Sequence, residues 1–190
     1  HKAIDGTNHY IEWRSQPYGN LVYAAARDIT DRVLAEERIL YLSNHDQLTG
    51  LYNRHFYELE LLKTDLPANL PLSLVMADLN GLKAANDTHG HLVGDKLLKK
   101  AAEVMRNKSR AKDIVCRIGG DEFMLILPGT SNRDAEALVR RMEDAMKTAA
   151  VDALAVSVAC GWATKVHPEE PIEEVFKKAE ANMYQKKASR

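Results

Sequence analysis

Apolar and polar positions follow two rhythms along most of this chain, one typical of strands and one typical of helices. Short apolar runs between polar residues predict strands, and apolar residues three or four apart predict helices. Beyond residue 53 the expected order is helix 54–63, strand 72–77, a helical stretch through Asn86, helix 94–108, strands 113–118 and 122–127, helix 132–149, strand 154–163 and helix 172–187. This order predicts an α+β domain with a central, mostly antiparallel sheet flanked by helices.

The first 45 residues carry a separate pattern. Strands 10–14 and 21–27 are expected to form a hairpin around Gly19-Asn20, and an isolated hairpin is marginal without partners. A helix is expected from Asp28 or Thr30, either of which can cap it, to about Asn44. Ile29, Val33 and Leu40 lie roughly on one stripe, flanked by Leu34 and Tyr41, and this stripe can pair with a second copy or pack on its own domain.

The most informative residues stand between strands 113–118 and 122–127. Gly119 and Gly120 allow a tight turn that another molecule can approach closely, and Asp121 and Glu122 follow at once. Asp78 comes directly after the apolar strand 72–77. A strand-end acid beside a hairpin tip with further acids suits a hard cation such as Mg²⁺ and a phosphate substrate. The alternatives are a surface hairpin with solvated acids and, for Asp78, a helix N-cap.

Residues 119–123 read GGDEF, the signature of the diguanylate cyclase family, and the resemblance spans roughly residues 46–187. Residues 46–54 resemble the family's DxLTGLxNR motif, 78–95 its DxDxFKxxNDxxGHxxGD stretch, and 179–187 its closing ADxALYxAK helix. The resemblance implies the ferredoxin-like palm of nucleotide cyclases. Residues 10–32 resemble the last two strands and the exit of a PAS sensor domain. The expected divisions are therefore residues 1–28 (truncated PAS), 29–45 (signalling helix) and 46–190 (cyclase).

The resemblance also implies an activity. Two GTP molecules would be joined into cyclic di-GMP with release of two pyrophosphates, in a homodimer whose subunits each hold one GTP. Mg²⁺ or Mn²⁺ in a two-metal site would be held by Asp78, the carbonyl of Leu79 and Asp121. Asp121 or Glu122 would accept the proton.

Further substrate contacts follow from the same resemblance. Lys83 and Lys187 would contact the phosphates, and Asn86 and Asp95 would read guanine, because a carboxylate can accept the paired N–H groups of that base. His91 lies in the same substrate-binding segment, where ordering the loop by hydrogen bonds is favoured over acting as a base.

Upstream of the hairpin, Arg110 and Asp113 match the family's RxxD element, which implies an inhibitory site for the product. The alternative for this short motif is an ordinary surface ion pair. Three other functions remain open: a receptor that binds cyclic di-GMP without catalysis, another nucleotidyl cyclase, and a purely structural dimerisation module.

Two positions depart from the family pattern. Asn80 replaces the usual second Asp, and since this is not a metal position of the family, activity is expected to survive. Gly81 replaces a bulky residue, which is expected to change the affinity for the nucleotide more than the type of reaction. We also expect Asp46 and Arg54 to pair and to fix the linker against the domain.

Composition limits the remaining possibilities. The formal net charge is −1 with acids and bases interspersed, so no basic surface indicates nucleic-acid binding. No apolar run reaches a membrane span and no signal-peptide pattern is present. We expect a bacterial cytoplasmic domain cut from a longer parent, with membrane attachment only if it is encoded upstream. Cys116 and Cys160 lie in apolar runs and are expected to be buried free thiols.

Overall fold

The computed structural model describes residues 8–188, and the chain divides into two compact units between Ser43 and Asn44. Each unit is described by itself. The first holds a hairpin and a helix, and the second holds the sheet and the helices that carry the GGDEF run.

In the first unit, β1 (Ile11–Tyr18) and β2 (Leu21–Asp28) pair in antiparallel fashion with Tyr18 opposite Leu21, which confirms the turn at Gly19-Asn20. Helix α1 (Thr30–Asn44) follows, and the carboxylate of Asp28 accepts hydrogen bonds from the backbone N–H and the hydroxyl of Thr30, at 2.9 and 2.6 Å. No α1 side chain is buried. The exposed apolar side chains of this unit form a long set: Tyr10, Trp13, Tyr18, Leu21, Val22, Tyr23, Leu34, Ile39, Leu40 and Tyr41.

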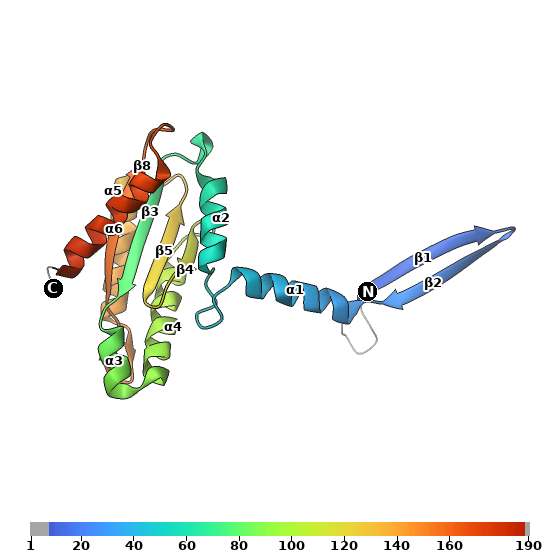
Figure 1. Cartoon of the computed structure of the whole chain (residues 1–190), viewed down its shortest axis with the longest axis horizontal. Helices are drawn as coiled ribbons and strands as arrows, with labels where there is room; N and C mark the ends of the chain where they lie inside the picture. Colours follow the sequence, from blue (N-terminus) through green and yellow to red (C-terminus); the bar gives the residue numbers. More distant parts are fainter. Residues whose placement is uncertain (1–7, 189–190) are drawn as a thin grey trace. The chain divides into compact units, whose positions relative to one another are not determined.

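The second unit is built on a four-stranded antiparallel sheet in the order β4-β5-β3-β8, flanked by helices (Figure 1). Its strands are β3 (Leu72–Leu79), β4 (Ile114–Arg117), β5 (Glu122–Leu127) and β8 (Val158–Lys165). Its helices are α2 (Arg54–Thr64), α3 (Leu82–His89), α4 (His91–Lys108), α5 (Asn132–Lys147) and α6 (Ile172–Ala188), with a short 3₁₀ turn at Pro67–Asn69. This arrangement confirms the expected α+β fold.

The two central strands supply both hydrophobic cores of this unit. Because successive side chains point to opposite faces, alternate residues of β3 and β5 enter different cores. Val75, Ala77 and Phe123 pack with residues of α4 and α5. Met76 and Met124 pack on the other face with residues of α2 and α6. All eight residues of β3 are buried, which explains why this strand appears in the sequence as a continuous apolar run.

Helix α6 lies unusually close to β8 because Gly161 has no side chain. A Cβ atom built on Gly161 would fall 2.1 Å from the backbone nitrogen of Met183 and 2.2 Å from the carbonyl oxygen of Ala179. Any larger residue would push the helix away from the sheet. The close approach therefore determines the distance between α6 and the sheet, including its last turn.

Several element boundaries differ from expectation, among them that of β1, which extends to Tyr18, and those of two elements in the second unit. The expected strand 154–163 is interrupted: β6 (Ala150–Val151) and β7 (Leu154–Ala155) form a small hairpin, and β8 begins only at Val158. Asp152 and Ala153 both adopt positive φ angles, of 49° and 69°, which is the backbone of a tight two-residue hairpin turn. Helix α4 begins at His91, earlier than the expected residue 94.

Candidate active site at the end of β3 and the GGDEF hairpin

The strand-end acid and the hairpin tip meet at one end of the sheet. Asp78 lies opposite Glu122 in the β3–β5 register, and the backbone N–H of Leu79 donates to the carbonyl of Asp121 at 2.9 Å. Asp78 is only 4% exposed. The sheet therefore brings a buried carboxylate beside the two acids that follow Gly119-Gly120.

A lysine from the far end of the sequence completes this cluster. The ammonium of Lys187, in the last turn of α6, donates to Oδ1 of Asp78 at 2.7 Å. This hydrogen bond, together with the negative charges of Asp78 and Asp121, raises the pKa of Lys187 above its ordinary value. The Lys187 ammonium thus interacts electrostatically with both acids of the candidate metal site.

The side chain of Glu122 lies beside the glycine turn. A Cβ atom on Gly119 would fall 2.7 Å from Oε2 of Glu122, so the glutamate side chain lies against Gly119. The charge of Glu122 also contributes to the raised pKa of Arg54, after the larger effect of its partner Glu58. The charge of Asp121 therefore acts on Lys187 and the charge of Glu122 acts on Arg54, while Glu122 is the residue opposite Asp78 in the strand register.

The donor set at this end of the sheet fits a hard divalent cation. Carboxylates and a backbone carbonyl are the oxygen ligands that Mg²⁺ takes, usually one or two carboxylates with the rest from substrate and water. The cation already present, the Lys187 ammonium, lies on Asp78 where such an ion would bind. Within residues 8–188, no group of three or more His, Cys, Asp or Glu side chains gathers at one point, so the protein supplies few ligands by itself.

The predicted guanine-reading residues lie on α3 and α4, which pack against each other. The side chain of Asn86 rests on Gly94, where a Cβ atom would fall 1.9 Å from Oδ1 of Asn86. That oxygen is buried and accepts no hydrogen bond in the described structure. Asp95 follows Gly94 and is half-buried. An unpaired buried acceptor is costly, so Asn86 is a good candidate to bind a ligand N–H group.

Other predicted residues of this segment lie at the surface. Lys83 is exposed on α3, and His91 is exposed at the start of α4, where the described residues offer its ring no hydrogen-bond partner. The expected ordering of the loop by His91 is therefore not seen. Asn80 donates from its side chain to the hydroxyl of Ser157 at 3.0 Å, and Gly81 adopts a φ of 72°. Gly81 thus serves a left-handed backbone position that favours glycine.

The expected pair between Asp46 and Arg54 is wrong. Arg54 pairs with Glu58 within α2 at 2.9 Å, while Asp46 accepts two hydrogen bonds from Arg117, at 3.1 and 3.2 Å. The same guanidinium donates to the carbonyl of Gly120 at 2.7 Å. Arg117 therefore joins the segment after α1 to the hairpin tip, a role that sequence reasoning missed because Asp46 and Arg117 are far apart in the chain.

Asp46 is well held in this position. Its partial burial would raise its pKa, but hydrogen bonds from the backbone and hydroxyl of Thr49 and from Arg117 outweigh that effect and lower the pKa. The carboxylate is therefore ionised at neutral pH. It can hold Arg117, and through it the hairpin tip, in one geometry.

The predicted inhibitory pair forms a turn directly before β4. The carboxylate of Asp113 accepts from the backbone N–H of Arg110 at 2.8 Å, and the backbone N–H of Asp113 donates to the carbonyl of Arg110 at 3.0 Å. The other carboxylate oxygen of Asp113 is buried without a hydrogen-bond partner, and Arg110 is exposed. The alternative of an ordinary side-chain ion pair is thus absent from the described contacts of these two residues.

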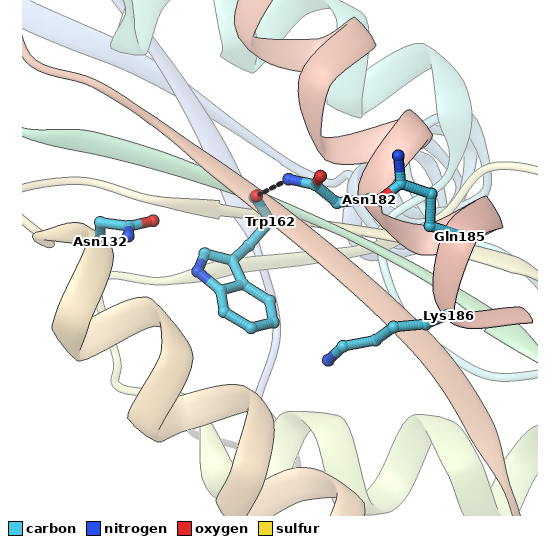
Figure 2. A pocket seen from close by; sticks show the side chains of 5 residues that line it. All are labelled: Asn132, Trp162, Asn182, Gln185 and Lys186. Carbon is cyan, nitrogen blue, oxygen red and sulfur yellow. Dashed lines mark hydrogen bonds between the residues drawn. The ribbon is translucent and has the colours of Figure 1, made fainter. Parts of the chain in front are cut away.

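A separate hollow of about 440 Å³ lies between α5, β8 and α6. Figure 2 shows its lining, in which Lys186 points toward the Trp162 ring, with the ammonium 4.5 Å from the ring centre. Asn182 donates to the carbonyl of Trp162 at 2.9 Å. None of the predicted site residues lines this hollow. The two neighbouring lysines therefore contact different groups: Lys186 lies at the Trp162 ring and Lys187 at the Asp78 carboxylate.

Both cysteines are buried, as expected, and neither Cys116 nor Cys160 forms a disulfide bond. Among the described residues, no helix is both long and apolar enough to span a membrane.

Comparison with known proteins identifies the family. The family described as "Diguanylate cyclase, GGDEF domain" matches residues 43–190. The diguanylate cyclase DgcM of Escherichia coli K12 is 32% identical over 98% of this chain and 47% of its own length. The chain therefore belongs to the GGDEF diguanylate cyclase family. Two further curated relatives are also longer than the chain, which spans 19% and 66% of their length.

Solved structures agree with this assignment. The diguanylate cyclase SiaD of Pseudomonas aeruginosa, crystallised with its activator SiaC, superposes with a TM-score of 0.72 at 32% identity, over 85% of this chain and 66% of SiaD. The coiled coil and GGDEF domain of DgcB from Caulobacter crescentus, crystallised with cyclic di-GMP, shares the fold with a TM-score of 0.77 at 24% identity, over 84% of this chain and 88% of DgcB.

Proposed function

We propose that this chain is a diguanylate cyclase that condenses two GTP molecules into cyclic di-GMP and two pyrophosphates. The observation that carries the proposal is the meeting of Asp78 with the GGDEF tip, with the ammonium of Lys187 on the same carboxylate. Membership of the family supports the reaction type. The intact acids at 121 and 122 favour catalysis over a binding role alone.

In this proposal each acid has a distinct task. Asp78, the carbonyl of Leu79 and Asp121 would hold Mg²⁺ or Mn²⁺, and the divalent ion would supply charge neutralisation at the triphosphate and a lower pKa for the attacking 3′-hydroxyl. The charge of Asp121 acts on the Lys187 ammonium, and the Glu122 side chain lies against Gly119. We therefore favour Asp121 for metal binding and leave Glu122 as the acid able to accept a proton from a second nucleotide.

Guanine would be read by Asn86 and Asp95. The Oδ1 atom of Asn86 is a buried acceptor that receives no hydrogen bond in the described structure. The guanine edge presents N–H donors that could supply one. Lys83 and Lys187 would contact the phosphates as point charges. His91 keeps a predicted place in this segment without a specific contact.

Each chain would hold one GTP, so turnover would require a homodimer with two facing half-sites. The exposed apolar residues of α1 support pairing of this helix with its copy. The exposed strands of β1 and β2 support their assignment to the end of a larger sensor sheet, as in a PAS domain. The sensor would then set how often the two half-sites meet.

Product inhibition at Arg110 and Asp113 is also proposed. The exposed guanidinium can bind phosphate or stack on a base, and the unpaired oxygen of Asp113 can accept from guanine. In wild type, added cyclic di-GMP should then slow turnover. Arg110→Ala should remove this inhibition while leaving initial rates unchanged.

The test of the main proposal is GTP turnover with Mg²⁺, following both pyrophosphate release and product mass across a range of protein concentrations. Paired half-sites predict a turnover rate that rises with the square of the protein concentration, as long as this concentration is below the dissociation constant of the homodimer. Asp78→Asn should reduce turnover by at least about a hundredfold, since a metal ligand is lost, while the surface variant Asp87→Asn should not. Cyclic di-GMP binding without any turnover would favour the receptor alternative, and a mononucleotide product would favour another cyclase.

A further inference from the structure

Lys187 has two incompatible partners. The proposed function requires its ammonium at the triphosphate, yet the structure places that ammonium 2.7 Å from Oδ1 of Asp78, a proposed metal ligand. An ammonium that still donated to Asp78 while it bound a phosphate would keep its charge on the oxygen that the divalent ion needs, so the two roles conflict. The inference below rests on the proposed function, because it concerns how that same site is filled.

The contact is built into the fold. Ala179, Met183 and Lys187 are spaced four apart on α6, so they follow one another along the helix face that meets the sheet. Ala179 and Met183 are fully buried, and Gly161 lets their backbone lie directly on β8. The next position on that face is Lys187, which reaches the end of β3 where Asp78 stands.

The charges make the contact stable. The Asp78 side chain is 6% exposed, and a carboxylate so far removed from water is costly without a cation beside it. Lys187 supplies that cation. A divalent ion on the same oxygen would be repelled by an ammonium held so close, so the two cations compete for Asp78.

We infer that Lys187 is a placeholder cation that holds the metal ligand Asp78 until nucleotide arrives. Triphosphate oxygens then give the ammonium a new anionic partner, and its departure frees Asp78. Divalent metal therefore binds weakly to the protein alone and binds well together with GTP. Lys187 acts as a positioning residue that couples the two binding events.

The test measures binding of Mn²⁺ alone, without nucleotide, by electron paramagnetic resonance of the free ion. Lys187→Met should bind Mn²⁺ on the order of tenfold to a hundredfold more tightly than wild type, the range that a charge-assisted hydrogen bond supports. Lys186→Met is the matched control. It removes the same charge one residue away, at the Trp162 ring, and should change the affinity by less than about threefold.

Three further variants make the result decisive. Lys187→Arg keeps a cation and should bind Mn²⁺ as weakly as wild type. Lys187→Gln is a second neutral replacement with the same expected gain as Lys187→Met, and it serves if the methionine variant does not fold. Adding Asp78→Asn to Lys187→Met should abolish the gain, because the freed ligand is then missing.

Equal Mn²⁺ affinity for wild type and both neutral variants would overturn the placeholder role, as would a gain that Lys186→Met reproduces or one that survives Asp78→Asn. These outcomes are separable from failure of the proposed function. A wild type that makes cyclic di-GMP but shows no Mn²⁺ difference refutes only the placeholder. A wild type without GTP turnover refutes the cyclase assignment whatever its Mn²⁺ affinity.

Discussion

Replacing Gly161 by alanine tests whether the backbone contact between β8 and α6 supports both the fold and the site. The new Cβ atom would stand 2.1 Å from the nitrogen of Met183, 2.2 Å from the carbonyl oxygen of Ala179 and 2.7 Å from the Cα of Met183. Non-bonded carbon contacts lie near 3.5–4.0 Å, so α6 would have to retreat by roughly 1–1.5 Å. Backbone atoms cannot rotate away as a side chain does.

The expected loss of stability lies at the upper end of the range for overpacked cores, about 3 kcal/mol. For a domain of this size that loss corresponds to a fall in Tm of about 6–12 °C. Urea and thermal unfolding, followed by circular dichroism, measure it. Gly120→Ala is the matched control for stability, because no atom lies within 4 Å of its Cβ position and its change should stay within about 0.5 kcal/mol.

The same substitution should disturb the site. A retreating α6 carries Lys187 away from Asp78, so GTP turnover should fall at a temperature where the variant is still folded. A Gly161→Ala protein that melts within about 1 °C of wild type and keeps its turnover would refute the reasoning, because α6 could then not be in backbone contact with β8.

Three other predictions follow from individual contacts. Gly94→Ala should move the side chain of Asn86, whose Oδ1 lies 1.9 Å from the new Cβ position, and should therefore weaken GTP binding in equilibrium titration. The free energy of unfolding should stay the same or rise by about 0.5–1 kcal/mol, because alanine is favoured over glycine inside a helix. Unchanged GTP affinity would argue against a role for Asn86. Since the pKa of Asp46 is lowered in the folded state, its contribution to stability is present above the ordinary value of 3.8 and is lost as the pH falls through the lower folded value. Asp46→Asn should therefore flatten the acid side of the stability–pH curve, and an unaltered curve would show that the hydrogen bonds from Thr49 and Arg117 to this carboxylate contribute nothing to stability. Burial raises the pKa of the Cys116 thiol to about 12, so iodoacetamide at pH 8 should label it only after unfolding in urea, and rapid labelling of the folded protein would contradict the buried position.

Local patterns were sufficient for the elements that depend on local chemistry. The continuous apolar runs of β3 and β5 predicted buried strands, and both strands were found with nearly the expected bounds. Asp28, one of the two expected caps, accepts a hydrogen bond from the backbone N–H of Thr30 at the start of α1. The turn of the first hairpin lies at Gly19-Asn20, as the turn preferences predicted. The small hairpin at Asp152 and Ala153 was missed because alanine gives no signal for a positive φ.

By itself, the sequence determined that an acid stands at the end of the apolar run of β3, that two more stand beside a glycine turn, and that these belong to a GGDEF domain. Only the tertiary structure decided which groups meet there. Arg117 takes Asp46, Lys187 takes Asp78, and Asn86 covers Gly94. Such contacts join segments that are far apart in the chain. They depend on how closely helices and strands pack, as in the contact between α6 and Gly161, and no local pattern of residues predicts that distance.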